Sequence, residues 1–157
     1  MKNLKKLSIF IILLGGLFLF TGCGNKNVEG SLEEIMTKIY ADIPEDQRPM
    51  MLGNMEVTSE NVEGFLGTTE IEYEEALASE SMVGAIAHSV VLVRAKEGAD
   101  IEAVKTTIKE NVNPRKWVCV GVEKDDVIIK NKGDLIIVII VEDTQTREKL
   151  EKGFDEL

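Results

Sequence analysis

The chain has 157 residues, with 28 acidic and 18 basic side chains and a formal net charge of −10. Nucleic-acid phosphates and anionic lipid headgroups repel so acidic a chain, which argues against nucleic-acid binding. All 28 acidic residues lie beyond residue 22, so residues 23–157 carry a net charge of −13 and make up one domain's length.

The first 22 residues have the pattern of a signal peptide. Three lysines precede an apolar run from Leu7 to Phe20, which is shorter than the roughly 20 residues of a membrane-spanning helix. Phe20-Thr21-Gly22-Cys23 follows and resembles the bacterial lipobox. The resemblance implies cleavage after Gly22 and a diacylglyceryl thioether on Cys23. The alternative is an ordinary signal peptide or an uncleaved anchor, with an incidental cysteine.

Lipidation would place the mature protein on the outer face of the bacterial cell membrane, with the membrane as its partner through the lipid on Cys23. Two or three acyl chains anchor a protein stably where one is marginal. We expect residues 23–30 to be the lipidated cysteine and a polar tether of roughly 15 Å, and residues 31–157 to be the domain. Once Cys23 is lipidated, Cys119 is the only free cysteine left, so we expect no internal disulfide. A hydrophobic core must then stabilise the domain.

The first half of the domain is expected to be mainly helical. The capping-box pattern Ser31-Leu32-Glu33-Glu34 predicts the start of a helix. Two prolines, Pro44 and Pro49, end regular structure, and residues 43–55 are expected to be irregular. A second, short helix would run to Leu66, with Gly67 as its left-handed C′ residue.

In the second half of the domain, apolar and polar residues alternate as they do in β-strands. Residues 71–77 are acidic on one side and suit an edge strand. Residues 88–95 and 118–122 are valine-rich strands, and residues 127–129 and 135–141 flank a hairpin loop at 131–133. Asp100 and Asp143 are expected to begin two further helices, the first of which Pro114 ends.

The segment Leu135 to Val141 is apolar at every position. Both of its faces must be covered, so we expect an inner strand with helices on one face and the N-terminal segment on the other. The order of elements predicts a single α+β domain. Its largely antiparallel sheet would have four to five strands packed by helices.

The sequence contains no recognisable catalytic constellation. His88 is the only histidine and is expected to be a solvent-edge or hydrogen-bonded structural residue. Cys119 alternates with Val118 and Val120, so it is expected to be a small buried hydrophobe. No zinc-ligand spacing or phosphate-binding glycine loop is present, and acidic pairs carry little weight in so acidic a chain. We therefore expect neither enzymatic activity nor a metal or cofactor.

One apolar segment lies outside the predicted helices and strands. The stretch from Arg48 to Asn54 contains no acidic residue and carries Met50, Met51 and Leu52. Interface cores are depleted of charge and enriched in methionine. These three residues are therefore the candidate contact with a protein partner. The alternative is that they cover the open face of the sheet.

Several stretches together suggest a family. They are Ser79-Glu80-Ser81-Met82, the segment Val90 to Gly98, Glu102-Ala103-Val104-Lys105, the apolar run Leu135 to Val141, and the lipobox. Over roughly residues 30–143, the chain resembles small Gram-positive lipoproteins known only as a domain of unknown function. The resemblance supports export and lipidation, and it brings no activity, ligand or site residue.

We therefore expect a membrane-anchored protein with a non-catalytic binding or accessory role and a possible protein partner in the cell envelope. The alternative is a cell-envelope enzyme, such as a carboxylate-based hydrolase. A deep cleft with two converging carboxylates of shifted pKa would favour the enzyme.

The lipid anchor is directly testable. Replacing the thiol in Cys23→Ser removes the only group that can form the thioether. We expect this variant to lose metabolic labelling with radioactive fatty acid and to accumulate as unprocessed precursor. Labelling that persists in the variant would contradict lipidation at this residue.

Overall fold

The computed structural model describes residues 27–157, so the expected signal peptide and Cys23 lie outside the described residues. Its elements, in chain order, are α1 (Leu32–Ile39), the 3-10 turn η1 (Glu45–Gln47), β1 (Leu52–Glu56), α2 (Val62–Leu66), β2 (Tyr73–Ser81), β3 (His88–Ala95), α3 (Ile101–Asn111), the 3-10 turn η2 (Lys124–Asp126), β4 (Ile128–Lys132), β5 (Leu135–Val141) and α4 (Thr144–Asp155). The predicted α+β class is confirmed. No helix within residues 27–157 has both the length and the apolar character needed to cross a bilayer.

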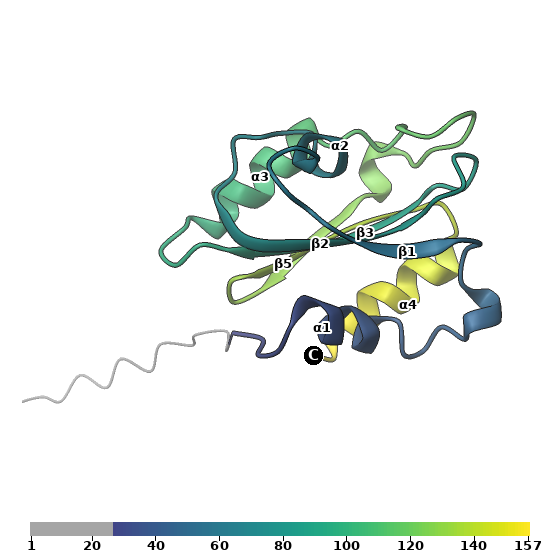
Figure 1. Cartoon of the computed structure of the whole chain (residues 1–157), viewed down its shortest axis with the longest axis horizontal. Coiled ribbons are helices and arrows are strands. Elements are labelled where there is room, and N and C mark those ends of the chain that lie inside the picture. Colours follow the sequence, from purple (N-terminus) through teal and green to yellow (C-terminus); the bar gives the residue numbers. More distant parts are fainter. Residues whose placement is uncertain (1–26) are drawn as a thin grey trace, which may run out of the picture.

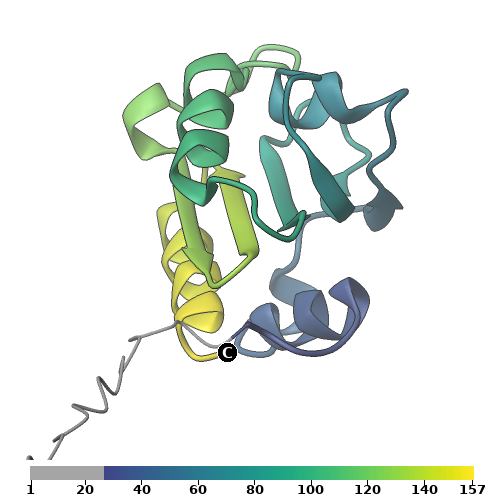
Figure 2. The ribbon, with the colours of Figure 1, turned by 90° about the vertical axis from the view of Figure 1, so that its left-hand side faces the viewer.

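The five strands form one sheet in the order β1-β2-β3-β5-β4, and every neighbouring pair is antiparallel. Strand β5 lies between β3 and β4, as expected for an all-apolar segment, and none of its seven residues is exposed. Helices α1 and α4 cover one face of the sheet, and α2 and α3 cover the other (Figures 1 and 2).

Alternation along the inner strands divides the core into two layers. Ile137 packs with α1 and α4, whereas the adjacent Val138 packs with α2, α3 and the segment around Trp117. Both side chains are fully buried, so the prediction of two-sided cover is confirmed. The expected source of that cover was wrong, because the N-terminal helix shares its face with the C-terminal helix α4 (Figure 1).

Local capping signals begin the helices where the sequence predicted. The Ser31 hydroxyl accepts from the Glu34 N–H at 3.3 Å, and the Glu34 carboxylate accepts from the Ser31 N–H at 3.2 Å. Asp100 and Asp143 cap α3 and α4 with their side chains. Gly67 ends α2 with a φ of 74°, which a glycine adopts without strain.

Two expectations for strands at the β1 side of the sheet were wrong. Residues 52–56 form β1, although the whole stretch 43–55 was expected to be irregular. As a result, β2 is an inner strand between β1 and β3, and not an edge strand. Gly53 and Asn54 have low strand propensity, so pairing with β2 must stabilise β1.

The expected strand at 118–122 is absent from the described structure. The N–H of Val118 donates to the carbonyl of Gly84, and the N–H of Val122 donates to the carbonyl of Pro114, so the segment loops between α3 and η2. Cys119 is exposed and not buried, with a φ of 63°. The hairpin loop is also displaced, because Lys132 pairs with Leu135 and leaves only Gly133 and Asp134 in the turn.

Arg94, at the end of β3, fixes the point where the described chain enters the domain. Its guanidinium donates to the carbonyls of Val28 and Gly30 at 3.0 Å each, and to the carboxylate of Glu75 at 2.8 Å. The end of the predicted tether is therefore bound at the end of the sheet where β3 finishes.

Helices α1 and α4 approach each other closely at Gly153. A Cβ added there would collide with the backbone of Ile39, whose Cα would lie 3.0 Å away. We expect Gly153→Ala to lower the free energy of unfolding by about 2 kcal/mol in urea titrations, despite the higher helix propensity of alanine. Gly64 in α2 has open space around it, so the matched Gly64→Ala variant should be neutral or more stable. Equal effects of the two changes would contradict the close approach.

Candidate functional site

The large hydrophobic side chains that residues 27–157 expose are four: Met50 (69%), Met51 (64%), Met82 (61%) and Val118 (69%). We call these four residues the end patch. Met50 and Met51 belong to the predicted contact segment, and Leu52 is half-buried at the start of β1. Sequence reasoning missed Met82, which directly follows a strand, and placed Val118 within a strand.

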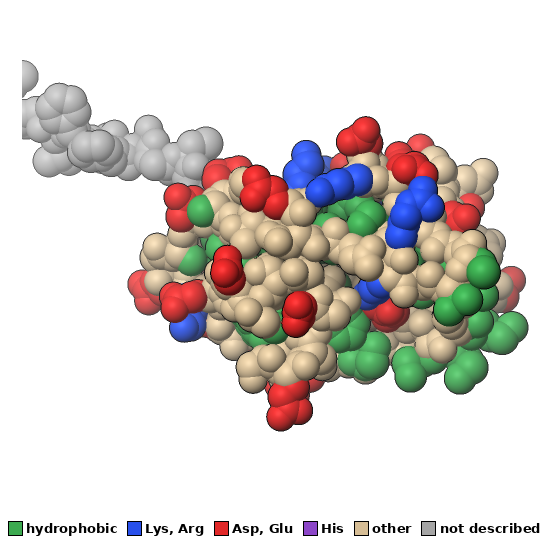
Figure 3. All heavy atoms as spheres, turned by 90° about the horizontal axis from the view of Figure 1, so that it is seen from above, with side chains coloured by type: hydrophobic (Ala, Val, Ile, Leu, Met, Phe, Trp, Pro, Cys, Tyr) green, Lys and Arg blue, Asp and Glu red, His purple; other side chains and the backbone are tan. Residues whose placement is uncertain are grey.

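Three chain segments converge to form the end patch. The Ser81 hydroxyl donates to the carbonyl of Met50 at 2.9 Å, and the N–H of Met82 donates to the carbonyl of Met51 at 3.1 Å. The N–H of Val118 donates to the carbonyl of Gly84 at 2.8 Å, which brings in the third segment. Hydrophobic side chains gather at this end of the molecule (right side of Figure 3).

The backbone at the end patch is strained. Met51 (φ 54°) and Cys119 (φ 63°) are the non-glycine residues with positive φ in the described chain, and Cys119 directly follows Val118. A left-handed conformation costs a non-glycine residue about 1–2 kcal/mol. Such outliers persist where the surrounding structure holds them, often at binding sites.

The end patch lies at the opposite end of the sheet from the tether. Near the C-terminal end of β3, Arg94 donates to the carbonyl of Val28 in the predicted tether. His88, six residues earlier, lies at the other end of β3, beside the hydrogen bond between Ser81 and Met50. Six strand residues span about 20 Å. Figure 1 shows this separation: the described chain begins at the left, and β1 and η1 lie at the right.

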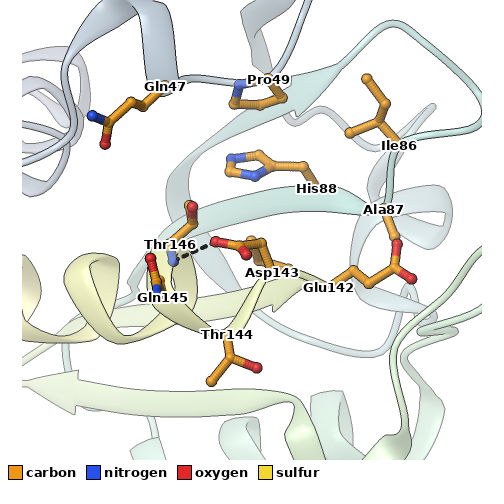
Figure 4. A pocket seen from close by; sticks show the side chains of 11 residues that line it. Gln47, Pro49, Ile86, Ala87, His88, Glu142, Asp143, Thr144, Gln145 and Thr146 are labelled. Atoms are coloured by element: carbon orange, nitrogen blue, oxygen red, sulfur yellow. Dashed lines mark hydrogen bonds between the residues drawn. The ribbon is translucent and has the colours of Figure 1, made fainter.

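An open depression of about 680 Å³ adjoins the end patch (Figure 4). Pro49 and Ile86 line one side, and Glu142 and Asp143, at the start of α4, line the other. The Asp143 carboxylate accepts from the N–H of Thr146 at 2.8 Å, and hydrogen bonding to the side chain and then to the backbone of Thr146 lowers the pKa of Asp143. The Asp143 carboxylate is therefore the N-cap of α4.

His88 forms the floor of this depression but is itself buried (3% exposed). Its Nε2 shares a hydrogen bond of 2.7 Å with the hydroxyl of Tyr40, so it is a hydrogen-bonded structural residue, one of the two expected alternatives. Burial lowers the pKa of His88 to about 4 and raises the pKa of Tyr40. Both groups are neutral at pH 7, and the bond joins β3 to the end of α1.

The remaining reactive side chains of residues 27–157 form neither a metal site nor a disulfide. Within residues 27–157, no three histidine, cysteine or carboxylate side chains cluster in a way that could hold a metal ion. Cys119 is exposed without a disulfide partner in the same range. Lys116 is bound to the carboxylate of Glu80 at 2.6 Å and lies over the rings of Phe65 and Trp117. Cys23, the predicted lipidation site, lies before the first described residue.

Comparison of the chain with protein-family models, with curated proteins and with solved structures finds no match.

The buried histidine should make stability depend on pH. Because the folded state lowers the pKa of His88 from 6.5 to about 4, the unfolded chain binds more protons between these values, and stability falls as the pH decreases through this window. We expect the wild type to lose about 2 kcal/mol more than His88→Gln between pH 7.5 and pH 4.5 in denaturant titrations. The carboxylates titrate in both proteins, so they cancel in the difference. Parallel pH profiles would contradict a neutral buried His88.

Proposed function

We propose that the mature protein is a lipid-anchored lipoprotein on the outer face of the bacterial cell membrane. Its role is non-catalytic: it binds a protein partner in the cell envelope through the end patch. In this proposal the lipid on Cys23 holds it at the membrane, and the chain is a member of the Gram-positive lipoprotein family that the sequence resembles. The end patch carries the proposal, because the exposed large hydrophobic side chains of residues 27–157 gather at one place.

The surroundings of the end patch support this role. Monomeric proteins seldom expose a contiguous group of large apolar side chains unless it contacts something. The rest of this chain is strongly acidic, which makes it soluble and a poor surface for tight contact. Methionine side chains are flexible and polarizable, so they adapt to a partner surface. The strain at Met51 and Cys119 is also located here.

The proposal predicts a complex that depends on the end patch. Membranes from cells that produce the full chain are extracted with a mild non-ionic detergent, and the particle mass is measured by size-exclusion chromatography with light scattering. We expect the wild type in a particle larger than one chain with its detergent. The Met50→Asp, Met51→Asp double variant should appear as a single chain, because two new charges would be buried without partners.

The matched control is Thr106→Asp, which places a charge at an exposed position on α3. This variant should keep the complex, and both proteins should unfold within about 0.5 kcal/mol of the wild type. A wild-type protein that runs as a single chain would overturn the proposed binding role.

A further inference from the structure

We propose that the end patch and the adjoining depression form one docking surface for a protein that presents a Lys or Arg side chain beside apolar side chains. The partner approaches from the side away from the membrane. This inference rests on the proposed function and specifies the chemistry of the partner. The apolar side chains would cover the methionines, and the cationic group would enter the depression beside Glu142.

The charges at this end of the domain are complementary to a cation. The basic side chains here have partners: Arg48 donates to the carbonyls of Ile43 and Tyr40, Lys149 donates to the side-chain oxygen of Gln47, and Lys116 and Arg115 pair with Glu80 and Glu123. Glu45, Asp46 and Glu142 are exposed. None of these three takes part in an ion pair within residues 27–157. Arg48 and Lys149 form no ion pair within residues 27–157 either, so three unpaired carboxylates face two unpaired cations and the uncompensated charge at this end is negative.

The depression provides a place for the cationic group next to the apolar contacts. Pro49, which directly precedes Met50, forms part of one wall, and Glu142 forms part of the other (Figure 4). No Lys or Arg lines it. A long basic side chain can lay its methylenes against Pro49 and Ile86 while its charged group approaches the Glu142 carboxylate.

The geometry disfavours the lipid bilayer as the occupant. Asn27 lies four positions after Cys23, a chain length that reaches at most about 14 Å. The tether end of the sheet is thus held near the membrane, and the end patch lies about 20 Å further along the strands. An acidic surface is also repelled by anionic lipid headgroups.

A second copy of the chain is disfavoured for two reasons. Each mature chain carries a net charge of −13, so two copies repel each other. In a symmetric dimer, the same patch on both copies meets across a two-fold axis. Because the patch lies opposite the tether, the two tethers would then point in opposite directions, and their short length could not bring both lipids to one membrane.

The test is site-specific photo-cross-linking in intact cells that produce the full-length chain. Benzoylphenylalanine replaces Met82 or Val118 in two separate variants, and Thr106 in a control. Positions 82 and 118 should give an adduct with the same protein, and position 106 should not. Mass spectrometry should place the cross-linked site on the partner within a few residues of a Lys or Arg flanked by apolar residues.

Charge reversal tests the depression separately. We expect Glu142→Lys to lower the adduct yield at position 82 by about five-fold, because a rim charge contributes on this scale. Glu148→Lys changes the net charge equally at an exposed position further along α4, and it should leave the yield unchanged. Raising the salt from about 0.05 M to about 0.5 M should also lower the yield.

Three results would overturn this inference. They are an adduct with the mass of two copies of this chain, an adduct only with lipid, and equal yields in Glu142→Lys and Glu148→Lys. If the detergent-extracted complex is present while one of these results is obtained, the proposed binding role stands and the partner chemistry is wrong. If the complex is absent as well, both fail.

Discussion

The structure depends on the burial of β5 on both of its faces. All seven residues of this strand are apolar and fully buried, and each buried aliphatic side chain contributes roughly 1.5–3 kcal/mol relative to exposure. One helical layer cannot cover both faces, so the chain must supply two. The first and last helices meet over one face, at the close contact of Gly153 with Ile39. The middle of the chain covers the other face.

The antiparallel sheet has two ends that differ in the chain segments they hold. Antiparallel strands place their connections at the two ends of the sheet, and Arg94 binds the incoming chain at one of them. The segments around Met51, Met82 and Val118 meet at the other. The loops at this end can hold a strained backbone because the core stabilises the domain and lies away from them. The same sheet therefore separates the proposed anchor from the proposed contact surface.

The fold class and many of its elements could be predicted from sequence because their signals are local. A capping box at Ser31 and the caps at Asp100 and Asp143 determine where helices begin, whatever packs around them. An uninterrupted run of Leu, Ile and Val can only be an inner strand in a domain of this size. The depression beside His88 had no such signal, since its walls come from segments more than 50 residues apart.

By itself, the sequence determined the α+β class and the inner position of residues 135–141, and it left open whether Met50 and Met51 are exposed or cover the sheet. Only the tertiary structure decided that β1 forms, that residues 118–122 leave the sheet and that Cys119 is exposed. The physical reason is that an edge strand and a connecting loop both depend on distant hydrogen-bond partners. Alternating valines satisfy a strand pattern equally well when no neighbouring strand is within reach. The end patch also depends on tertiary structure, because the antiparallel strand order determines which loops lie side by side at that end of the sheet.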